Sequence, residues 1–247
     1  EMIEDNLASM TEVAQANAHL AKQDLGPGSV KAVSVDSLMW GRAPSPHHFE
    51  SHYELNSERF AMALVRLAQL DPFDFVEFPE YAGIGYATLR RRLERHELPG
   101  VSLAVRIHGS LELIDQAEGV PATELGRLRM YRMERLALKL ADVVLGPSKT
   151  MCAQYGWGHG LEAERLVVSP PPMKVLLHDL KPARRAPDPA HFLLYGKLQE
   201  VKGCDTFVQA GVTLLLTAAE IPWRFTIVGR DTYCPRHQQM ASVCIRK

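Results

Sequence analysis

The segment FLLYGKLQEVKGCD, from Phe192 to Asp205, joins a short apolar run to a polar loop that has a glycine at each end. The apolar run predicts a buried strand over residues 191–195, and the residues after the loop predict a helix over 204–219. In an open parallel sheet, ligands bind at the carboxyl ends of the strands, which is where Lys197 and Lys202 would lie. The N-terminus of the following helix adds unpaired N–H groups and a partial positive charge. The residues therefore predict a diphosphate-binding loop, and two solvated surface lysines remain an equally weighted alternative.

Strand and helix signals alternate on both sides of this segment. Apolar runs predict further strands at residues 30–35, 73–78, 101–107, 143–145, 166–168 and 224–228. Helical spacing predicts helices at 8–23, 54–70, 83–96 and 123–140, and another that begins at Ser148 and ends at Gly156. Leu125, Leu128, Leu136 and Leu140 are expected to face the core. The alternation predicts an α/β protein with parallel sheets flanked by helices.

The proline-rich residues 170–190 divide this pattern. We predict a Rossmann-like domain over residues 1–172, an interdomain connector over 173–190, and the beginning of a second Rossmann-like domain over 191–247. A single strand–helix–strand unit buries too little apolar surface to fold alone. The sequence is therefore expected to continue beyond Lys247, and the first domain to lack its opening strand.

Composition excludes several function classes. The net charge of −1 gives no sign of nucleic-acid binding, and no apolar run approaches the roughly 20 residues of a membrane span. The four cysteines have neither zinc-site nor disulfide spacing. These features predict a cytoplasmic protein. The arginine clusters at residues 90–95 and 127–135 are interpreted as solvated helix faces, with peripheral contact with anionic lipid as the alternative.

The loop of residues 196–203 resembles the Gly-Arg/Lys…Lys-Gly loop of glycosyltransferase family 4, whose members have the two-domain GT-B fold. Residues 105–109 (VRIHG) resemble that family's strand ending in His-Gly, and residues 73–76 (FDFV) and 133–148 also fit its pattern. The resemblance covers roughly residues 10 to 230. Lys197 stands where arginine is commoner, and residues 168–171 (VSPP) depart from the family's Asn-Gly or Asn-Pro turn.

The resemblance implies transfer of a sugar from a UDP-, GDP- or ADP-sugar to a hydroxyl of a sugar, lipid-linked or small-molecule acceptor, with retention and without a metal. It assigns the donor diphosphate to Lys197 and Lys202 with Gly196 and Gly203, and a catalytic position in the cleft to His108. Further cleft candidates are Gly109, Arg106, Glu80 and Arg230.

Two motifs of the family are expected outside this sequence: a glycine-rich loop upstream of Glu1 and a paired-glutamate motif downstream of Lys247. On that basis the chain alone is expected to be inactive. A GT-B-type sugar-nucleotide epimerase and a non-catalytic sugar-nucleotide binding module remain alternatives. Asp142 and Ser148 are expected to be structural, and Gly83 and Gly85 to permit close packing.

Overall fold

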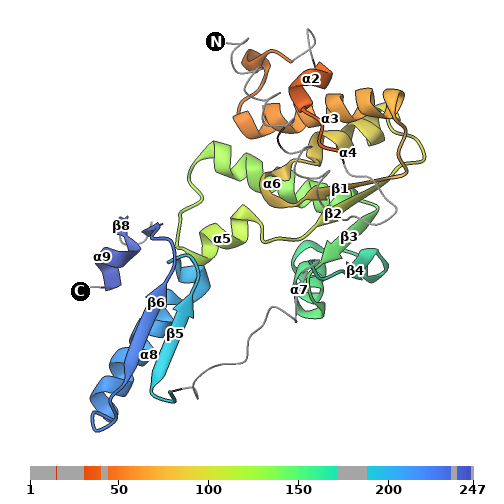
Figure 1. Cartoon of the computed structure of the whole chain (residues 1–247). Helices are drawn as coiled ribbons and strands as arrows, with labels where there is room; N and C mark the ends of the chain where they lie inside the picture. Colours follow the sequence, from red (N-terminus) through yellow and green to blue (C-terminus); the bar gives the residue numbers. More distant parts are fainter. Residues whose placement is uncertain (1–14, 16–30, 40–43, 172–187, 235–237, 246–247) are drawn as a thin grey trace. The chain divides into compact units, whose positions relative to one another are not determined.

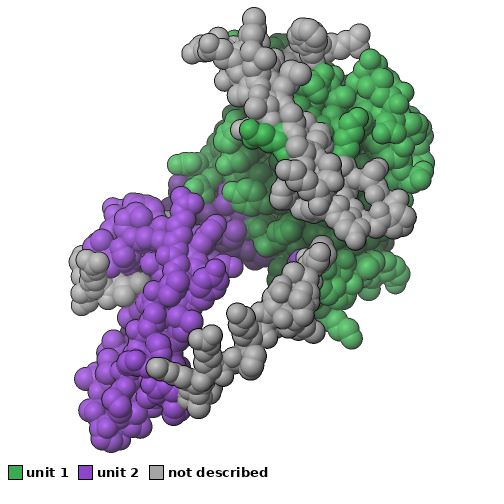
Figure 2. All heavy atoms as spheres, in the orientation of Figure 1, with its two compact units in different colours: residues 1–110, 124–170 green, residues 111–123, 171–247 purple. Residues whose placement is uncertain are grey.

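The computed structural model describes residues 15, 31–39, 44–171, 188–234 and 238–245 (Figure 1). The chain divides into two compact units, one of residues 1–110 and 124–170 and the other of residues 111–123 and 171–247 (Figure 2). Residues 111–123 thus group with the second unit, although they fall within the predicted first domain. The domain boundaries at 172 and 190 stay a prediction.

The first unit is built on a parallel sheet. Strands β1 (Phe75–Pro79), β2 (Ser102–Arg106), β3 (Val143–Gly146) and β4 (Leu166–Val168) lie side by side in that order. The described part of this unit includes the α-helices α2 (Val35–Met39), α3 (His52–Leu70), α4 (Tyr86–Arg95), α6 (Leu125–Leu140) and α7 (Lys149–His159). The predicted α/β class, a parallel sheet flanked by helices, is confirmed.

The core of this unit forms where one face of the sheet meets the helices. Leu103 and Val105 point to the same face because side chains alternate along a strand, and both are fully buried. They pack with Leu138 of α6 and Tyr155 of α7 in one continuous cluster. Full burial of each such apolar side chain contributes roughly 1.5–3 kcal/mol to folding.

The inward face of α6 agrees with the prediction only in part: Leu140 packs against the core cluster as expected, while the leucines at the start of the helix do not. Leu125 is 61% exposed and Leu128 is 45% exposed. The buried residues of this helix are Met130, Tyr131, Met133, Glu134, Ala137 and Leu138. These residues recur at helical spacing, so the helix has two candidate stripes, and the leucine-rich one at its start is not the one that packs.

Three predicted elements need correction. The predicted strand at 30–35 is wrong over its described part, because residues 31–34 are not in a strand and α2 begins at Val35, while residue 30 lies outside the described residues. The helix that begins at Ser148 does not end at Gly156 but continues to His159, and Gly160 with a φ of +62° forms its C-cap. The predicted helix at 8–23 lies outside the described residues except for residue 15. A short helix that the sequence did not indicate, α5 (Leu111–Ala117), belongs to the second unit.

Two glycines permit close packing, as expected. A Cβ on Gly83 would lie 2.6 Å from Cβ of Met133, and one on Gly85 would lie 2.7 Å from Cγ of Phe78. Gly83 also has a φ of +59°, in the left-handed region that favours glycine. Both positions serve the packing of the turn that precedes α4.

Polar side chains fix the ends of several elements. Ser148 accepts the N–H of Met151 at 3.2 Å and caps α7. Asp142 accepts hydrogen bonds from Arg92 Nη2 at 2.8 Å and from the N–H of Leu103 at 2.8 Å, which ties α4 and β2 to the start of β3. These contacts confirm the structural roles expected for Asp142 and Ser148.

The arginine run of α4 is less solvated than predicted. Arg91 donates from Nε to Oε1 of Glu58 at 2.8 Å, and its side chain is only 12% exposed. Arg90 reaches the same Glu58, while Arg92 pairs with Asp142. These three guanidinium groups therefore join helices and strands within the unit.

The second unit has a smaller parallel sheet. Strands β5 (His191–Tyr195) and β6 (Arg224–Val228) pair in parallel, and α8 (Cys204–Thr217) follows β5 as predicted. The ring of Phe207 on α8 meets Phe225 of β6 edge to face at 5.8 Å. The remaining described elements are the 3-10 helix η5 (Glu200–Lys202), the antiparallel strands β7 (Tyr233–Cys234) and β8 (Gln239–Met240), and α9 (Ala241–Ile245).

Candidate functional site

The loop that follows β2 presents one side chain outward and holds its backbone inward. His108 is exposed, between the buried residues Ile107 and Ser110. Its imidazole makes no hydrogen bond with the residues that the structure describes. The backbone N–H groups of His108 and Gly109 both donate to Oε2 of Glu80, each at 3.2 Å. Glu80, at the end of β1, is itself fully buried.

Tyr155 of α7 extends this arrangement by one residue. Its hydroxyl accepts the N–H of Ser110 at 3.1 Å and lies beside the Glu80 carboxyl. Three consecutive N–H groups, from His108 to Ser110, thus donate to buried side chains. Gly109 has a φ of +113°, a conformation that favours glycine, so the His-Gly order has a local structural reason.

Burial has the largest effect on the pKa values of Glu80 and Tyr155. It raises the pKa of Glu80, and the nearby Tyr155 hydroxyl and the two backbone N–H groups lower it by less. The pKa of Tyr155 is also raised, first by burial and then by the Glu80 carboxylate. Oε1 of Glu80 has no hydrogen-bond partner among the described residues, since the Tyr155 hydroxyl does not meet it in hydrogen-bonding geometry.

Buried groups also fix the turn after Glu80. Glu134 of α6 accepts the N–H of Ala82 at 2.9 Å, and Ala82 has a φ of +61°. Ser57 of α3 donates to the carbonyl of Ile84 at 2.9 Å and accepts the N–H of Ala87 at 2.9 Å. Sequence analysis assigned no role to Ser57 or Tyr155, because the partner of a polar residue in an amphipathic helix is known only from the folded chain.

Arg106, a predicted cleft residue, is engaged within the first unit. Its Nε and Nη2 donate to the two carboxylate oxygens of Glu77 at 2.6 and 2.8 Å. Its Nη1 donates to the carbonyl of Ser169 at 2.8 Å. Arg106 therefore links β1, β2 and the chain after β4, and a role for it in ligand contact stays a prediction.

In the second unit, glycines shape the loop between β5 and α8. Gly196 ends β5 with a φ of +149°, and its N–H donates to the carbonyl of Val228 at 2.9 Å. A Cβ on Gly229 would collide with the carbonyl of Gly196, so the ends of β5 and β6 approach as closely as only glycine permits. Gly203, with a φ of +76°, ends η5 and caps α8.

The predicted phosphate-binding lysines lie in this loop. Lys197 and Lys202 are both exposed, and neither forms an ion pair or side-chain hydrogen bond with a residue that the structure describes. The 14-residue helix α8 begins directly after Gly203, so its N-terminal N–H groups lie next to Lys202 in the chain. Arg230 is exposed in the loop after β6, and its carbonyl accepts the N–H of Leu198 at 3.0 Å.

These positions fit one class of protein. The parallel sheet flanked by helices, with polar and basic residues in the loops after its strands, is consistent with a Rossmann-like domain of the GT-B class of glycosyltransferase folds. Residues 12–172 match the family described as glycosyl transferase 4-like domain. The match covers more than half of the chain, and the protein belongs to this family of glycosyl transferases. A search of curated proteins finds no match to the chain.

The family match confirms the resemblance to glycosyltransferase family 4 and gives the chain a general role in glycosyl transfer. Within the described ranges, no group of three or more His, Cys, Asp or Glu side chains is arranged to hold a metal ion. No helix of the described part of the chain is long and apolar enough to cross a membrane.

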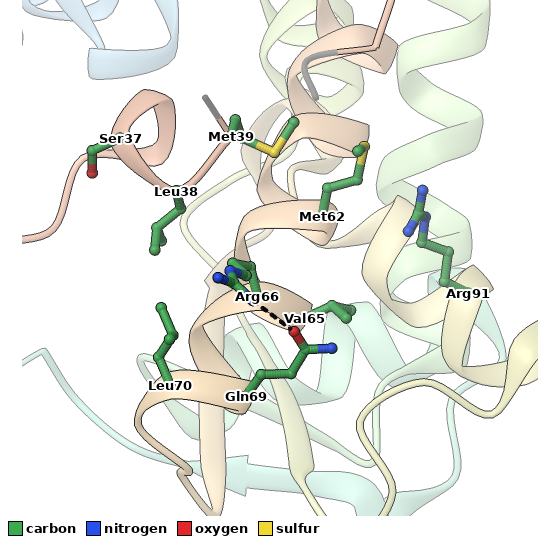
Figure 3. Close-up of a pocket in the computed structure, with 9 residues that line it drawn as sticks. All are labelled: Ser37, Leu38, Met39, Met62, Val65, Arg66, Gln69, Leu70 and Arg91. Atoms are coloured by element: carbon green, nitrogen blue, oxygen red, sulfur yellow. Dashed lines mark hydrogen bonds between the residues drawn. The ribbon is translucent and has the colours of Figure 1, made fainter. Parts of the chain in front are cut away.

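A separate pocket of about 440 Å³ lies in the first unit between α2 and α3 (Figure 3). Its lining combines apolar side chains with a few polar ones: Ser37, Leu38, Met39, Met62, Val65, Arg66, Gln69, Leu70 and Arg91. None of the predicted site residues lines it. Arg66 donates to Gln69 at 3.3 Å within the pocket, and Arg91 is held by Glu58.

Proposed function

We propose that this protein transfers a sugar from a nucleoside-diphosphate sugar, with UDP, GDP or ADP as the nucleotide, to an acceptor hydroxyl. The transfer retains the anomeric configuration and uses no metal. The observation that carries the proposal is the loop of residues 196–203, in which two exposed lysines without acidic partners among the described residues precede the N-terminus of α8.

The chemistry of the reaction explains why these charges matter. Negative charge builds on the diphosphate as it leaves the sugar, so cations placed beforehand stabilise the transition state more than the ground state. Hydrogen bonds to charged groups contribute roughly 1.5–3 kcal/mol each. Lysine supplies a point charge without the two-pronged geometry of arginine, so Lys197 neutralises the phosphate without fixing its orientation.

The other site residues have complementary roles in this proposal. His108 contacts the donor sugar or the acceptor hydroxyl through its exposed imidazole, and Gly109 lets the backbone turn beside it. Arg230 reaches the nucleotide. The acceptor is a sugar, a lipid-linked sugar or a small molecule in the cytoplasm. Peripheral contact with anionic lipid is less well supported, because Arg90, Arg91 and Arg92 pair with carboxylates.

Nucleotide binding tests the loop directly. Titration calorimetry with UDP, GDP and ADP is expected to give binding of at least one nucleotide to the protein. Lys197→Ala and Lys202→Ala should each raise its Kd by about tenfold to a few hundredfold, which corresponds to roughly 1.5–3 kcal/mol. Lys139→Ala, which removes an exposed lysine of α6, is the matched control and should leave the Kd unchanged.

Turnover distinguishes the proposed activity from its alternatives. In a transfer assay of the full-length protein with labelled donor, kcat/KM of the Lys202→Ala variant should fall by about tenfold to a few hundredfold. An unchanged kcat/KM would exclude a phosphate-binding role for Lys202. Nucleotide binding with neither transfer nor epimerisation would identify a binding module, and failure of all three nucleotides to bind would overturn the proposal.

A further inference from the structure

The loop of His108 has an arrangement typical of an anion site. Successive backbone N–H groups that point to one side of a loop form a concave surface that binds anions. Here the N–H groups of His108 and Gly109 converge on one carboxylate oxygen, Oε2 of Glu80, at 3.2 Å each. The protein's own carboxyl occupies the position, so these two N–H groups are not free to bind a substrate.

We propose that Glu80 is a positioning residue for His108, which it holds through the backbone so that the imidazole faces the ligand side of the strand end. The inference rests on the proposed function, because it takes His108 as a residue of the transfer site. Glu80 cannot itself touch a ligand, since it is fully buried. This positioning role differs from the cleft-lining role that the position of Glu80, directly after Pro79, suggests.

The cost of the arrangement supports a specific role. A carboxyl that is fully buried and leaves Oε1 without a partner among the described residues is unfavourable for stability. The compensating groups all belong to the loop of His108 or face it: the two N–H groups and the Tyr155 hydroxyl. Only a side chain with an acceptor oxygen at this position satisfies both N–H groups, and Glu80 does so with one oxygen.

Two other buried polar side chains, Tyr155 and Glu134, contact residues close to His108 and Glu80 in the chain. Tyr155 holds Ser110, two residues after His108, and Glu134 holds Ala82, two residues after Glu80. Neither contacts the backbone of His108 itself. Glu134 is therefore a suitable control, because it is also a buried carboxylate that accepts a loop N–H group in the same unit.

A spectroscopic experiment tests the contact in the unmodified protein. With ¹⁵N-glycine labelling, the Gly109 amide resonance is expected to shift with pH as the Glu80 carboxyl titrates, with a midpoint above the ordinary range for glutamate. Glu80→Gln should abolish this titration, and Glu134→Gln should leave it in place. A Gly109 amide that does not respond to pH in the unmodified protein overturns the proposal, whether or not the variants fold.

A double-mutant cycle tests the functional consequence. With the full-length protein and whichever of UDP-, GDP- or ADP-glucose it turns over, Glu80→Met, which removes the acceptor oxygen, should lower kcat by about tenfold to a hundredfold with little change in KM, because misplacing a reacting group mainly affects the chemical step. In a His108→Ala background, Glu80→Met should have no further effect. Glu134→Met should lower stability and leave kcat within about twofold of its original value.

The outcomes separate the inference from the function on which it rests. If the effects of Glu80→Met and His108→Ala are additive, Glu80 acts elsewhere and the inference fails while the proposed function stands. If His108→Ala keeps full activity, the role of His108 in the proposed function fails. An equal loss of kcat in the Glu134→Met variant would show that Glu80 acts only through general stability.

Discussion

Arg106 shows how one side chain organises the strand ends of the first unit. Its fork-shaped guanidinium binds both oxygens of Glu77 at 2.6 and 2.8 Å and also the carbonyl of Ser169 at 2.8 Å. Such two-pronged pairs combine energy with fixed geometry. The departure of residues 168–171 from the family pattern is therefore compatible with an ordered chain at this point, because Arg106 holds Ser169 in place.

This pair makes stability depend on pH. The hydrogen bond from Arg106 lowers the pKa of Glu77 in the folded protein below its ordinary value of 4.5. The resulting stabilisation is present above about pH 4.5 and is lost as the pH falls through the lower folded pKa. Glu77→Gln should therefore reduce the loss of unfolding free energy between about pH 7 and about pH 3.5, measured by urea denaturation.

Glu162→Gln is the control for this prediction, because Glu162 is exposed and has no ion pair among the described residues. It should leave the pH dependence unchanged. If Glu77→Gln behaves in the same way, the Arg106 pair does not contribute to stability in solution. The pair is partly exposed to solvent, so the effect should also weaken in high salt.

At single residues, the sequence predicted positions better than partners. It placed His108 at a strand end and assigned structural roles to Asp142 and Ser148, because strand ends and helix caps have local signatures. It did not show that Glu80 turns inward to the His108 backbone. That contact joins residues 28 positions apart, and no local pattern specifies it.

Among the secondary-structure elements, α6 has an unusual C-terminal end. No glycine follows its last residue, Leu140, and the helix instead ends against the side chain of Arg165. Nη2 of Arg165 donates to the carbonyls of Leu138 and Lys139 at 3.0 Å each and also reaches that of Ala141. A positive group at a helix C-terminus satisfies carbonyls that have no partner within the helix and interacts favourably with its dipole.

Removal of this cap should destabilise the first unit. Arg165→Ala is expected to lower the free energy of unfolding by about 1–2 kcal/mol, and Arg165→Lys to restore part of the loss. The measurement is urea denaturation followed by circular dichroism. Arg132→Ala, which removes an exposed arginine from α6 itself, should change stability by less than about 0.5 kcal/mol. Equal effects of the two alanine variants would contradict the capping role.

Element types followed from periodicity, while element ends and faces depended on neighbours. Gly156 lies within α7 and does not end the helix. A Cβ at this position would lie 2.9 Å from Leu166, so the glycine serves the packing of the helix against this side chain. The helix ends at Gly160, which adopts a left-handed conformation. Several glycines in this segment can adopt that conformation, so the sequence alone did not identify the one that ends the helix. The buried face of α6 is likewise set by the turn at Gly83, which lies against Met133.

The two units of the molecule differ in how much core they contain. The first unit has a continuous cluster that includes Leu103, Val105 and Leu138. The second has a small buried cluster of Leu198, Cys204 and Ala241, against which Leu194 and Ile227 pack. A unit with little buried apolar surface is marginally stable, so ligand binding contributes a larger share of its stability.

Trp223 makes this dependence measurable in the second unit. Its indole N–H donates to the carbonyl of Ala218 at 2.9 Å, and its ring lies 5.8 Å from that of Phe192. Trp157, in the first unit, is 91% exposed and so is a poor reporter of unfolding. In a variant in which Trp223 is the only tryptophan, its fluorescence should report the unfolding of the unit that carries the proposed phosphate loop.

A bound nucleoside diphosphate should stabilise this unit. At a concentration of about 100 times Kd, it is expected to raise the unfolding free energy reported by Trp223 by about 2.7 kcal/mol, because it binds only the folded state. At the same concentration, Lys202→Ala should lose about half of this gain if its Kd is about tenfold higher and nearly all of it if its Kd is a few hundredfold higher, whereas Lys139→Ala should keep it. If calorimetry detects binding but the Trp223 transition does not move, the nucleotide binds outside the second unit, and the assignment of the diphosphate to Lys197 and Lys202 is wrong.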